Sequence, residues 1–262
     1  MTAPLISIRN LCVDYITDAG DVRACNNVSF DIAPGEVMTL MGVSGVGKST
    51  VLNWLIGAPQ PMFTVEGEAW LCDQRVDLLP TEQKRIGILF QDDLLFPHFS
   101  VGDNLAYALP AQTKGSKARQ QAIKEGPDSA GLSDFYDRDP ATLSGGQRAR
   151  VSLLRALIAE PQALLMDEPF GALDIKTRLQ MQDLLISIWE KFNPTILFVT
   201  HDIQEAVYLG DDIFIMKHAP SNFVKKIHVD LPFQRTRATK RLPRFDELVH
   251  EVEDAMMQID TE

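Results

Sequence analysis

The sequence of 262 residues predicts an α/β fold built around a parallel sheet. Short apolar or β-branched runs recur along the chain, and several are apolar throughout rather than alternating, as strands buried on both faces are. Helix-length stretches separate these runs, which is the order of strands joined by crossover helices. The predicted strands are 36–41, 85–90, 163–166, 195–200 and 211–217, and the predicted helices include 48–56, 144–159 and 176–192.

Composition and charge place the chain among ordinary globular proteins. Hydrophobic residues make up 45% and charged residues 23%, which excludes a disordered or fibrous chain. The net charge of −11 argues against a surface that binds nucleic acid over the whole molecule. Cys12, Cys25 and Cys72 form no Cys-x-x-Cys pair, so we expect buried, reduced thiols rather than a disulfide scaffold or a zinc site.

No segment of the sequence predicts secretion or membrane insertion. Residues 1–9 lack the basic start and the long apolar stretch of a signal peptide. No apolar run approaches the ~20 residues that cross a membrane as a helix. We therefore expect a chain that is soluble by itself and works at a membrane only through a partner.

The N-terminal region and the middle of the chain depart from the parallel pattern. Residues 6–32 alternate between apolar and polar and contain turn residues, which predicts antiparallel β structure. Residues 101–142 lack strand signals and are rich in Lys, Gln, Ala and Asp, which predicts a helical insertion. The tail beyond Lys217 has room for a strand at 223–229, a basic loop at 235–244 and a final helix.

We therefore predict four segments. An N-terminal β subdomain with the first part of the core occupies 1–95, a helical subdomain 96–160, the second part of the core 161–217 and a short tail 218–262. The tail is too short for a further domain of usual size. Its basic residues could contact lipid headgroups or a membrane partner, but a solvated loop is the favoured interpretation for such a charge run; they are Arg235, Arg237, Lys240, Arg241 and Arg244.

The strongest motif is a glycine-rich loop at 42–49. Its residues, Gly42-Val43-Ser44-Gly45-Val46-Gly47-Lys48-Ser49, match G-x-x-x-x-G-K-[ST] in full, between a predicted strand and a predicted helix. The glycines let backbone N–H groups point at phosphate oxygens, and the helix N-terminus adds a partial positive charge. We expect Lys48 to neutralise the β- and γ-phosphates and Ser49 to bind Mg²⁺. The strand–loop–helix context disfavours the alternative of a glycine-rich turn without a ligand.

Two carboxylates, Asp167 and Glu168, follow the apolar strand 163–166. After a buried strand, in a chain with a phosphate loop, Asp167 is expected to hold Mg²⁺ through water and Glu168 to act as general base toward a water molecule. Without that context, two surface acids at a strand end would be the simpler interpretation.

Gln91 and His201 follow predicted strands in the same way. Ligands of doubly wound sheets bind beyond the carboxyl ends of the strands. We therefore expect Lys48, the two carboxylates, Gln91 and His201 to converge on one crevice. Either residue alone would be interpreted as part of a turn.

A further motif, Leu143-Ser144-Gly145-Gly146-Gln147, precedes the predicted helix 144–159. Taken alone it is a helix N-cap made by Ser144. A capped N-terminus with two glycines can also bind an anion, and a second anion site in this chain would need a second source of phosphate.

Together these motifs resemble the ATP-binding subunits of ABC transporters over about 6–217. Residues 143–147 resemble the family signature, Gln91 the Q-loop glutamine, Asp174 part of the D-loop and His201 the switch histidine. Tyr15 stands where the family has an aromatic residue that stacks on adenine. The resemblance implies a P-loop NTPase (RecA-like) core with an N-terminal antiparallel β subdomain and a helical insertion.

The resemblance also implies the site residues. Catalytic roles fall to Glu168, His201 and Gln91, and Mg²⁺ is held by Ser49, Gln91 and Asp167. ATP is bound by Tyr15, Gly42, Ser44, Gly45, Val46, Gly47, Lys48, Ser49, Thr50, Ser144, Gly145, Gly146, Gln147 and Asp174.

The mechanism that the resemblance implies needs two copies of the chain, paired head to tail. ATP would lie between the phosphate loop of one copy and residues 144–147 of the other, with Ser144 and Gly146 contacting the γ-phosphate. ATP would drive closure, and hydrolysis with Glu168 as base and His201 sensing the γ-phosphate would reopen the pair.

Transport implies a permease in the membrane. Residues 92–101 place leucine and phenylalanine side chains in an acidic loop broken by proline. Such apolar side chains are unfavourable on a surface that no partner covers. The loop resembles the groove that importer ATPases offer to a permease; packing between the insertion and the core is the alternative. It is most similar to importers of the iron, thiamine, polyamine and sugar type. We expect a cytoplasmic protein on the inner face of the plasma membrane, indirectly served by a periplasmic or lipid-anchored solute-binding protein.

Some residues depart from the family pattern. Arg148-Ala149-Arg150 replaces a glutamine-rich run, and Gly171 stands where serine is more usual. Many importers of this group carry an extra β-rich C-terminal domain, in place of which this sequence has a short tail. With these departures the sequence resembles a poorly characterised importer subgroup, and they do not identify the solute.

Two other functions are alternatives. A non-transport ABC ATPase of DNA repair or translation would carry a long coiled coil or two fused units, and the interval from Lys48 to Ser144 is short. The acidic charge also disfavours nucleic acid as a partner. An exporter subunit is weakly disfavoured by the loop at 96–101.

Overall fold

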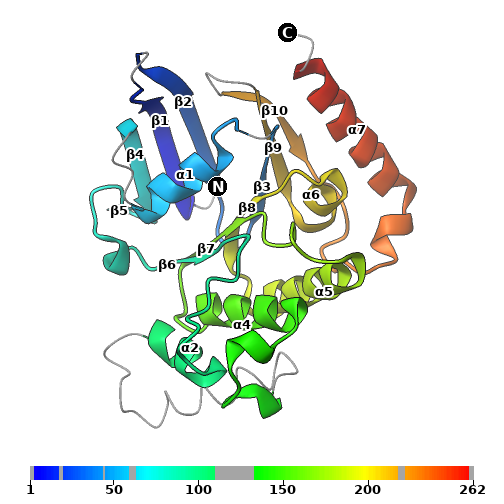
Figure 1. Cartoon of the computed structure of the whole chain (residues 1–262). Helices are drawn as coiled ribbons and strands as arrows, with labels where there is room; N and C mark the ends of the chain where they lie inside the picture. The colour runs from blue at the N-terminus through cyan, green and yellow to red at the C-terminus, as the bar shows by residue number, and fades with distance from the viewer. Residues whose placement is uncertain are drawn as a thin grey trace.

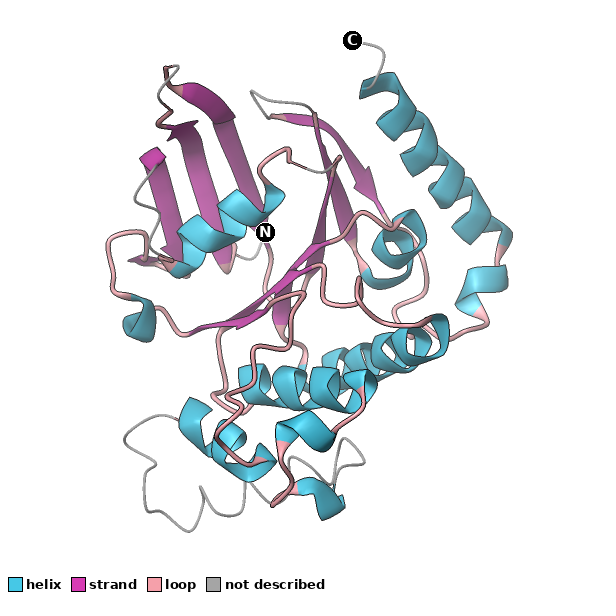
Figure 2. Cartoon of the chain, in the orientation of Figure 1, coloured by secondary structure: helices cyan, strands magenta, loops and turns pink. Residues whose placement is uncertain are grey.

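The computed structural model describes residues 3–17, 20–43, 45–58, 63–109, 133–217 and 222–259. It contains two sheets, with helices between them and along the outer face of the larger sheet (Figures 1 and 2). The predicted α/β fold is confirmed.

The larger sheet has six strands in the order β10-β9-β3-β8-β7-β6. Neighbouring strands run parallel except at one edge, where β10 runs antiparallel to β9. Every residue of β3, β8 and β9 is buried, as the continuous apolar runs predict. The strands are β3 (Val37–Met41), β6 (Ile86–Leu89), β7 (Ala163–Asp167), β8 (Thr195–Val199), β9 (Asp212–Met216) and β10 (Phe223–His228).

The smaller sheet is antiparallel, as the alternating N-terminal sequence predicts, with the order β2-β1-β4-β5. Its strands are β1 (Ile6–Tyr15), β2 (Val22–Ile32), β4 (Phe63–Leu71) and β5 (Gln74–Arg75). Sequence reasoning did not find β4, which pairs with β1. Gly67 of β4 has φ +130°, and a Cβ there would lie 2.8 Å from the Cα of Leu11, so the close approach of these strands requires glycine.

Helix α1 (Lys48–Ile56) lies between the two sheets (Figure 1). It shares one apolar core with Met38 and Leu40 of β3 and with the smaller sheet. The opposite face of the larger sheet, which presents Val37 and Met41, packs against helices from later in the sequence. These are α4 (Gly145–Leu157), α5 (Ile175–Phe192), α6 (Ile203–Leu209) and α7 (Pro243–Ile259).

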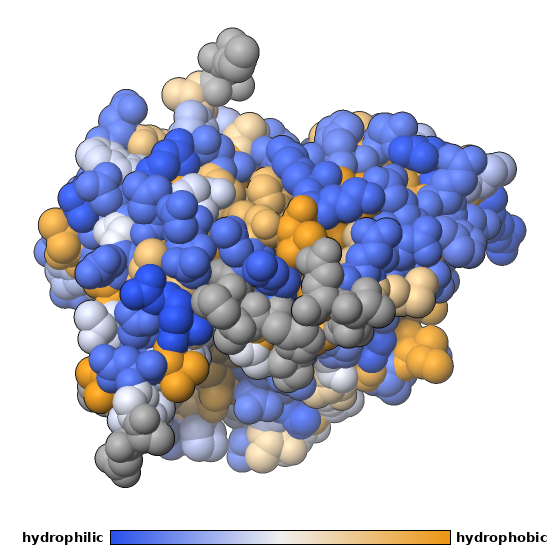
Figure 3. All heavy atoms as spheres, turned by 90° about the horizontal axis from the view of Figure 1, so that it is seen from above, coloured by the Kyte–Doolittle hydropathy of each residue, from blue (hydrophilic) through white to orange (hydrophobic). Residues whose placement is uncertain are grey.

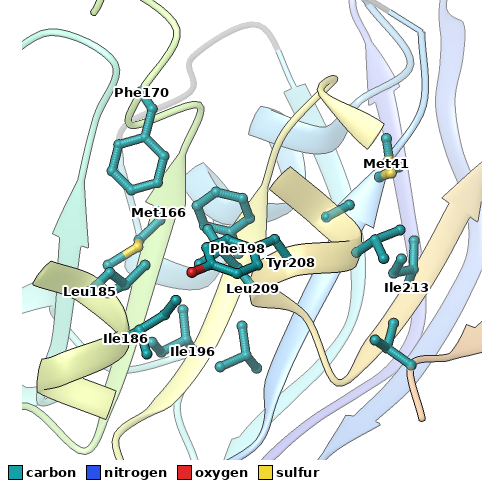
Figure 4. Close-up of a cluster of buried hydrophobic side chains, with 14 of the residues drawn as sticks. Met41, Met166, Phe170, Leu185, Ile186, Ile196, Phe198, Tyr208, Leu209 and Ile213 are labelled. Carbon is teal, nitrogen blue, oxygen red and sulfur yellow. The ribbon is translucent and has the colours of Figure 1, made fainter. Parts of the chain in front are cut away.

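The core on this second face joins strands and helices that are far apart in the sequence. Figure 4 shows Phe170 and Phe198 among Met166, Leu185, Ile186 and Tyr208. The rings of Phe170 and Phe198 lie 5.9 Å apart. This packing fixes the strand ends that carry the polar residues of the site.

The described part of the predicted helical insertion is helical. It holds α2 (Val101–Ala108) and two short 3₁₀ turns, Ser133–Phe135 and Pro140–Thr142, while residues 110–132 lie outside the described ranges. Val101 and Leu105 of α2 pack with Leu143 and Val151 in a small separate core. Two further 3₁₀ turns are Thr81–Gln83 and Thr239–Arg241.

The tail packs on the core, and four of the five basic residues at 235–244 have hydrogen-bond partners. Arg235 is 3% exposed and donates to the carbonyls of Tyr208 and Gly210 and to the carboxylate of Asp211. Arg237 pairs with Asp183, Lys240 donates to Gln182, and Arg244 pairs with Asp230. The solvated-loop interpretation is therefore wrong for Arg235, whose acceptors are distant in the sequence, whereas Arg237 and Arg241 are exposed as predicted.

Surface properties follow the composition in part. The face seen in Figure 3 is mostly hydrophilic, with hydrophobic residues in small separate groups. No helix among the described residues is long and apolar enough to cross a membrane.

Cys25 is buried as expected, but Cys72 is exposed because it lies in the turn between β4 and β5.

The half-buried carboxyl group of Glu36, directly before β3, generates a pH prediction. Burial and a hydrogen bond with Asp212 raise the pKa of Glu36 to about 7. Asp212 is also paired with Lys226 and with His228 Nδ1, and Asp211 beside it binds Arg235. The folded chain thus keeps a proton on Glu36 that the unfolded chain releases above its usual pKa of 4.5. Protonated Glu36 therefore stabilises the folded state at acid pH, and this contribution is lost as the pH rises toward 7.

We expect Glu36→Gln to reduce the fall in melting temperature between about pH 5 and about pH 8, because an amide donates to Asp212 at every pH. Thermal unfolding of both proteins across this range measures the difference. Parallel pH profiles for the two proteins would contradict the assignment.

Candidate functional site

The glycine-rich loop wraps around the ammonium group of Lys48, which is 5% exposed. Its Nζ donates to the carbonyls of Gly42 at 2.8 Å and Val43 at 2.9 Å. Gly47 has φ +92° and a Cβ there would lie 3.0 Å from Cys25 Sγ, so the turn into α1 requires glycine. Ser44 lies outside the described residues.

Gly45 and Val46 also belong to the predicted loop. Gly45 has φ +82°, and the Val46 side chain is buried in the core beneath the loop. A loop of this shape followed by a helix N-terminus presents N–H groups to an anion.

The charge on Lys48 is held close to two carboxylates. Burial lowers the pKa of Lys48, and Glu168 and Asp167 counteract this shift. A buried cation held by carbonyl oxygens would gain from a bound anion. The loop is therefore suited to phosphate.

Asp167 ends β7 and accepts a hydrogen bond from the Ser49 hydroxyl at 3.0 Å. Burial raises the pKa of Asp167, and the Ser49 bond opposes this. The hydrogen bond brings two oxygen atoms together from the loop and from the strand end.

Glu168 has a left-handed backbone with φ 46°, which is uncommon for a residue other than glycine. Its N–H donates to the Val199 carbonyl at 2.9 Å, and its carboxylate lies 3.0 Å from His201 Nδ1. The ends of strands β7 and β8 thus bring these two side chains close together. Such local strain is common at functional sites.

Gln91 reaches the same region from the end of β6. A Cβ added to Gly171 would lie 3.3 Å from Gln91 Nε2 and 3.4 Å from the Glu168 carbonyl oxygen. The N–H of Gly171 donates to that carbonyl at 3.0 Å. A side chain at 171 would crowd Gln91, which is a physical reason for glycine there.

Tyr15 lies beside the loop helix, where its hydroxyl hydrogen-bonds with Thr50 Oγ1 at 2.9 Å. Its ring meets the edge of Phe63 at a centroid distance of 4.2 Å. No local sequence pattern pointed to Phe63, because its place opposite Tyr15 comes from the pairing of β1 with β4. A cavity of about 220 Å³ adjoins this group, lined by Thr50, Trp54, Gly57, Ala58, Phe63, Val65 and Asp77.

Residues 144–147 begin α4 on the other face of the sheet. Ser144 and Gln147 form a capping box, in which the Ser144 N–H donates to Gln147 Oε1 at 2.8 Å and the Gln147 N–H donates to Ser144 Oγ at 3.3 Å. A Cβ at Gly146 would lie 2.5 Å from Thr177 Cγ2, so α4 and α5 approach closely here. The space beside Gly145 is open. A Cβ added there would have one described neighbour within 4 Å, the side chain of Arg148.

Asp174 caps α5 in a similar way. Its carboxylate accepts from the N–H of Thr177 at 3.1 Å and from the Thr177 hydroxyl at 2.6 Å. These bonds lower the pKa of Asp174. The predicted signature and D-loop residues therefore form one surface around Thr177. Among the described residues, no hydrogen bond or ion pair joins this surface to Lys48 or Ser49.

The comparisons with known proteins decide the family. A profile of the family described as ABC transporter matches residues 25–171, which is more than half of the chain. The chain belongs to the ABC transporter family. As an ABC transporter ATP-binding subunit it has a P-loop NTPase core and ATPase activity.

Relatives of this ABC subunit cover most of its length. The uncharacterized ABC transporter ATP-binding protein YnjD of Escherichia coli is 50% identical over 196 residues, 74% of this chain and 90% of that protein. The aliphatic sulfonates import ATP-binding protein SsuB of Bacillus cereus is 37% identical over 232 residues, 88% of this chain and 89% of that protein.

A solved ABC structure has the same fold. The ATP-binding cassette MJ0796, in a dimeric post-hydrolysis state bound to ADP and Pi, matches with a TM-score of 0.73 and 30% identity. The match covers 86% of this chain and 98% of that chain.

The loop after Gln91 forms an aromatic surface on this ABC subunit. Rings of Phe96, Phe99 and Tyr107 lie within 4.8 to 6.1 Å of one another. Tyr107 is 64% exposed and Leu94 56% exposed, while the loop backbone is held by buried Asn104. We call Leu94, Phe96, Phe99 and Tyr107 the aromatic loop surface.

Lys48→Ala should weaken binding of a nucleoside triphosphate by about tenfold or more, because a buried charge-assisted hydrogen bond is lost. Calorimetric titration with Mg-ATP measures the affinity. Lys225→Ala, which removes a surface lysine paired with Glu251, is the matched control and should bind normally. Equal affinities for the two variants would contradict the role of Lys48.

Proposed function

We propose that this chain is the ATP-hydrolysing subunit that powers import of a small solute by an ABC transporter, through head-to-tail closure of two copies. One observation carries the proposal. The phosphate loop leads into α1 and Ser144 caps α4, and these two helices pack on opposite faces of the same sheet. A second copy can bring its own cap to the phosphate loop of the first.

Binding of ATP relies on the loop and the adjacent aromatic residue. Lys48 and the N–H groups of the loop hold the phosphates, and Tyr15 supports the base. Asp167 and the Ser49 hydroxyl fit a magnesium ion, which prefers oxygen ligands and takes most of the rest from water and phosphates. Mg²⁺ would neutralise charge on the phosphates, with Gln91 close to the same edge.

Hydrolysis follows from the placement of Glu168 and His201. Glu168 orients a water molecule and accepts its proton as the water oxygen bonds to the γ-phosphorus. The bond from that phosphorus to the β–γ bridging oxygen breaks, which leaves ADP and inorganic phosphate. His201, 3.0 Å from Glu168, holds the carboxylate in place and reports on the γ-phosphate.

Pairing of two copies is supported by the dimer of MJ0796 bound to ADP and Pi. Ser144 and Gly146 would offer a helix N-terminus to the γ-phosphate of the partner copy. Closure is favoured as long as the γ-phosphate joins both copies, and its release favours opening.

Import through a permease is supported by the name of SsuB, an aliphatic sulfonates import ATP-binding protein, and by the aromatic loop surface. Exposed Leu94 and Tyr107 are suited to an apolar partner helix. The chain would then work at the inner face of the plasma membrane, with a solute-binding protein acting on the permease from outside. The solute itself would contact other chains.

Glu168→Gln should trap a dimer with ATP and lower turnover by about a hundredfold or more, since the general base is lost while the nucleotide contacts remain. Gel filtration with and without Mg-ATP, together with phosphate release, measures both effects. A variant that stays monomeric with Mg-ATP, or that hydrolyses at the normal rate, would overturn the scheme.

Tyr107→Asp should reduce co-purification of an integral membrane permease from cells and leave ATP hydrolysis by the isolated chain unchanged. Leu78→Asp changes a residue that is 76% exposed elsewhere and is the matched control. Mass spectrometry of the purified complexes identifies the membrane partner. Recovery of no integral membrane protein with the unmodified chain would refute the importer proposal.

A further inference from the structure

Residues 93–94 are tied to the signature helix by a group of bonds that the proposed reaction does not use. Arg148 Nε donates to Asp93 Oδ2 at 3.0 Å, and the Ser152 hydroxyl donates to the Asp93 carbonyl at 2.6 Å. Arg155 donates to the carbonyls of Asp93 at 3.2 Å and Leu94 at 2.7 Å. We call Arg148, Ser152 and Arg155, with Asp93 and Leu94, the α4 clamp.

The spacing of the clamp residues places them on one side of α4. Positions 148, 152 and 155 are four and three residues apart, so their side chains lie above one another on the same helix face. All three donate to Asp93, and Arg155 donates to Leu94 as well. The loop and the helix are therefore joined as one unit.

The two ends of this unit lie at different functional places. At one end, Gln91 lies beside Gly171, whose N–H donates to the Glu168 carbonyl of the same subunit's crevice. At the other end, Arg148 also donates through a second nitrogen to the Leu143 carbonyl at 2.7 Å. Leu143 directly precedes the Ser144 cap, so Arg148 bridges the loop and the start of the signature.

Stability alone is a weak reason for this arrangement. The Asp93 and Arg148 side chains are 26% and 38% exposed, and ion pairs of this kind contribute little to stability. Leu94 has a left-handed backbone with φ 44°, which is unfavourable for a large side chain, and that side chain is largely exposed. Hydrogen bonds from α4, rather than burial, hold the loop in this shape.

We propose that Arg148 is a positioning residue that links nucleotide in a subunit's own crevice to the position of the Ser144 cap that the subunit offers to its partner. The inference rests on the proposed head-to-tail dimer and deepens it. A ligand that draws Gln91 toward the phosphates shifts Asp93, and the clamp passes this shift to Leu143 and Ser144. The two ATP sites of a dimer are then coupled, because each copy's cap serves the other copy's nucleotide.

The test uses the full chain in the Glu168→Gln background, in which the dimer accumulates. Arg148→Met removes both bonds of the bridge, and we expect it to raise the ATP concentration that gives half-maximal dimer by about tenfold, within the usual range for coupled sites. Binding of ADP to the monomer, followed by calorimetry, should not change. In chains that retain Glu168, the Hill coefficient of ATP hydrolysis should fall toward one.

Three further variants separate coupling from folding. Ser152→Ala removes one clamp bond with little loss of volume and should give a smaller shift in the same direction. The Asp93→Asn and Arg148→Met changes should not be additive, because they break the same bridge. Arg237→Met, which removes an exposed pair with Asp183, is the matched control and should dimerise normally.

The possible negative results lead to different conclusions. If the Glu168→Gln parent does not dimerise with ATP, the proposed function is wrong. If the parent dimerises but Arg148→Met has the same ATP dependence and Hill coefficient, the coupling inference alone is wrong. A loss of ADP binding equal to the loss of dimer, or a matching effect of Arg237→Met, would also overturn it.

Discussion

Strands β3, β6, β7 and β8 run parallel and end at one edge of the central sheet. The polar residues that follow them can meet only because of this shared direction. Asp167, Glu168 and His201 are brought together with the phosphate loop by strands that are far apart in the sequence. The apolar packing on both faces of the sheet fixes this edge, so the chemistry depends on the core beneath it.

The same sheet explains why one chain holds only half of the proposed site. Helix α1 packs on one face and α4 on the other, each presenting an N-terminus suited to phosphate. The capping box of Ser144 already satisfies part of the α4 N-terminus, while Gly146 lets α4 approach α5 closely. A composite site between two copies uses both termini, and the α4 clamp gives a physical route by which one site could influence the other.

Local signals in the sequence predicted the parts of the structure that are determined locally. The helix predicted at 48–56 coincides with α1, and the five predicted core strands are present with small shifts at their ends. The convergence of Gln91, Asp167, Glu168 and His201 also followed from strand order. The roles of these residues stay predictions.

Features that depend on contacts between distant segments could not be predicted in this way. Strand β4 contains glutamate and glycine and is held by its pairing with β1. The position of Phe63 opposite Tyr15 depends on that pairing. The burial of Arg235 depends on carbonyls of α6 and the residue after it, and the bridge made by Arg148 depends on a loop that lies far from it in the sequence.

A complementation measurement tests the composite site most directly. One variant carries Lys48→Ala and cannot bind phosphate normally; the other carries Ser144→Arg and cannot offer its cap. Neither should hydrolyse ATP alone. If each site joins the loop of one copy to the cap of the other, mixing the two variants restores hydrolysis, because the mixed dimer contains one intact site. A mixture that stays as inactive as its components would contradict a site shared between two copies.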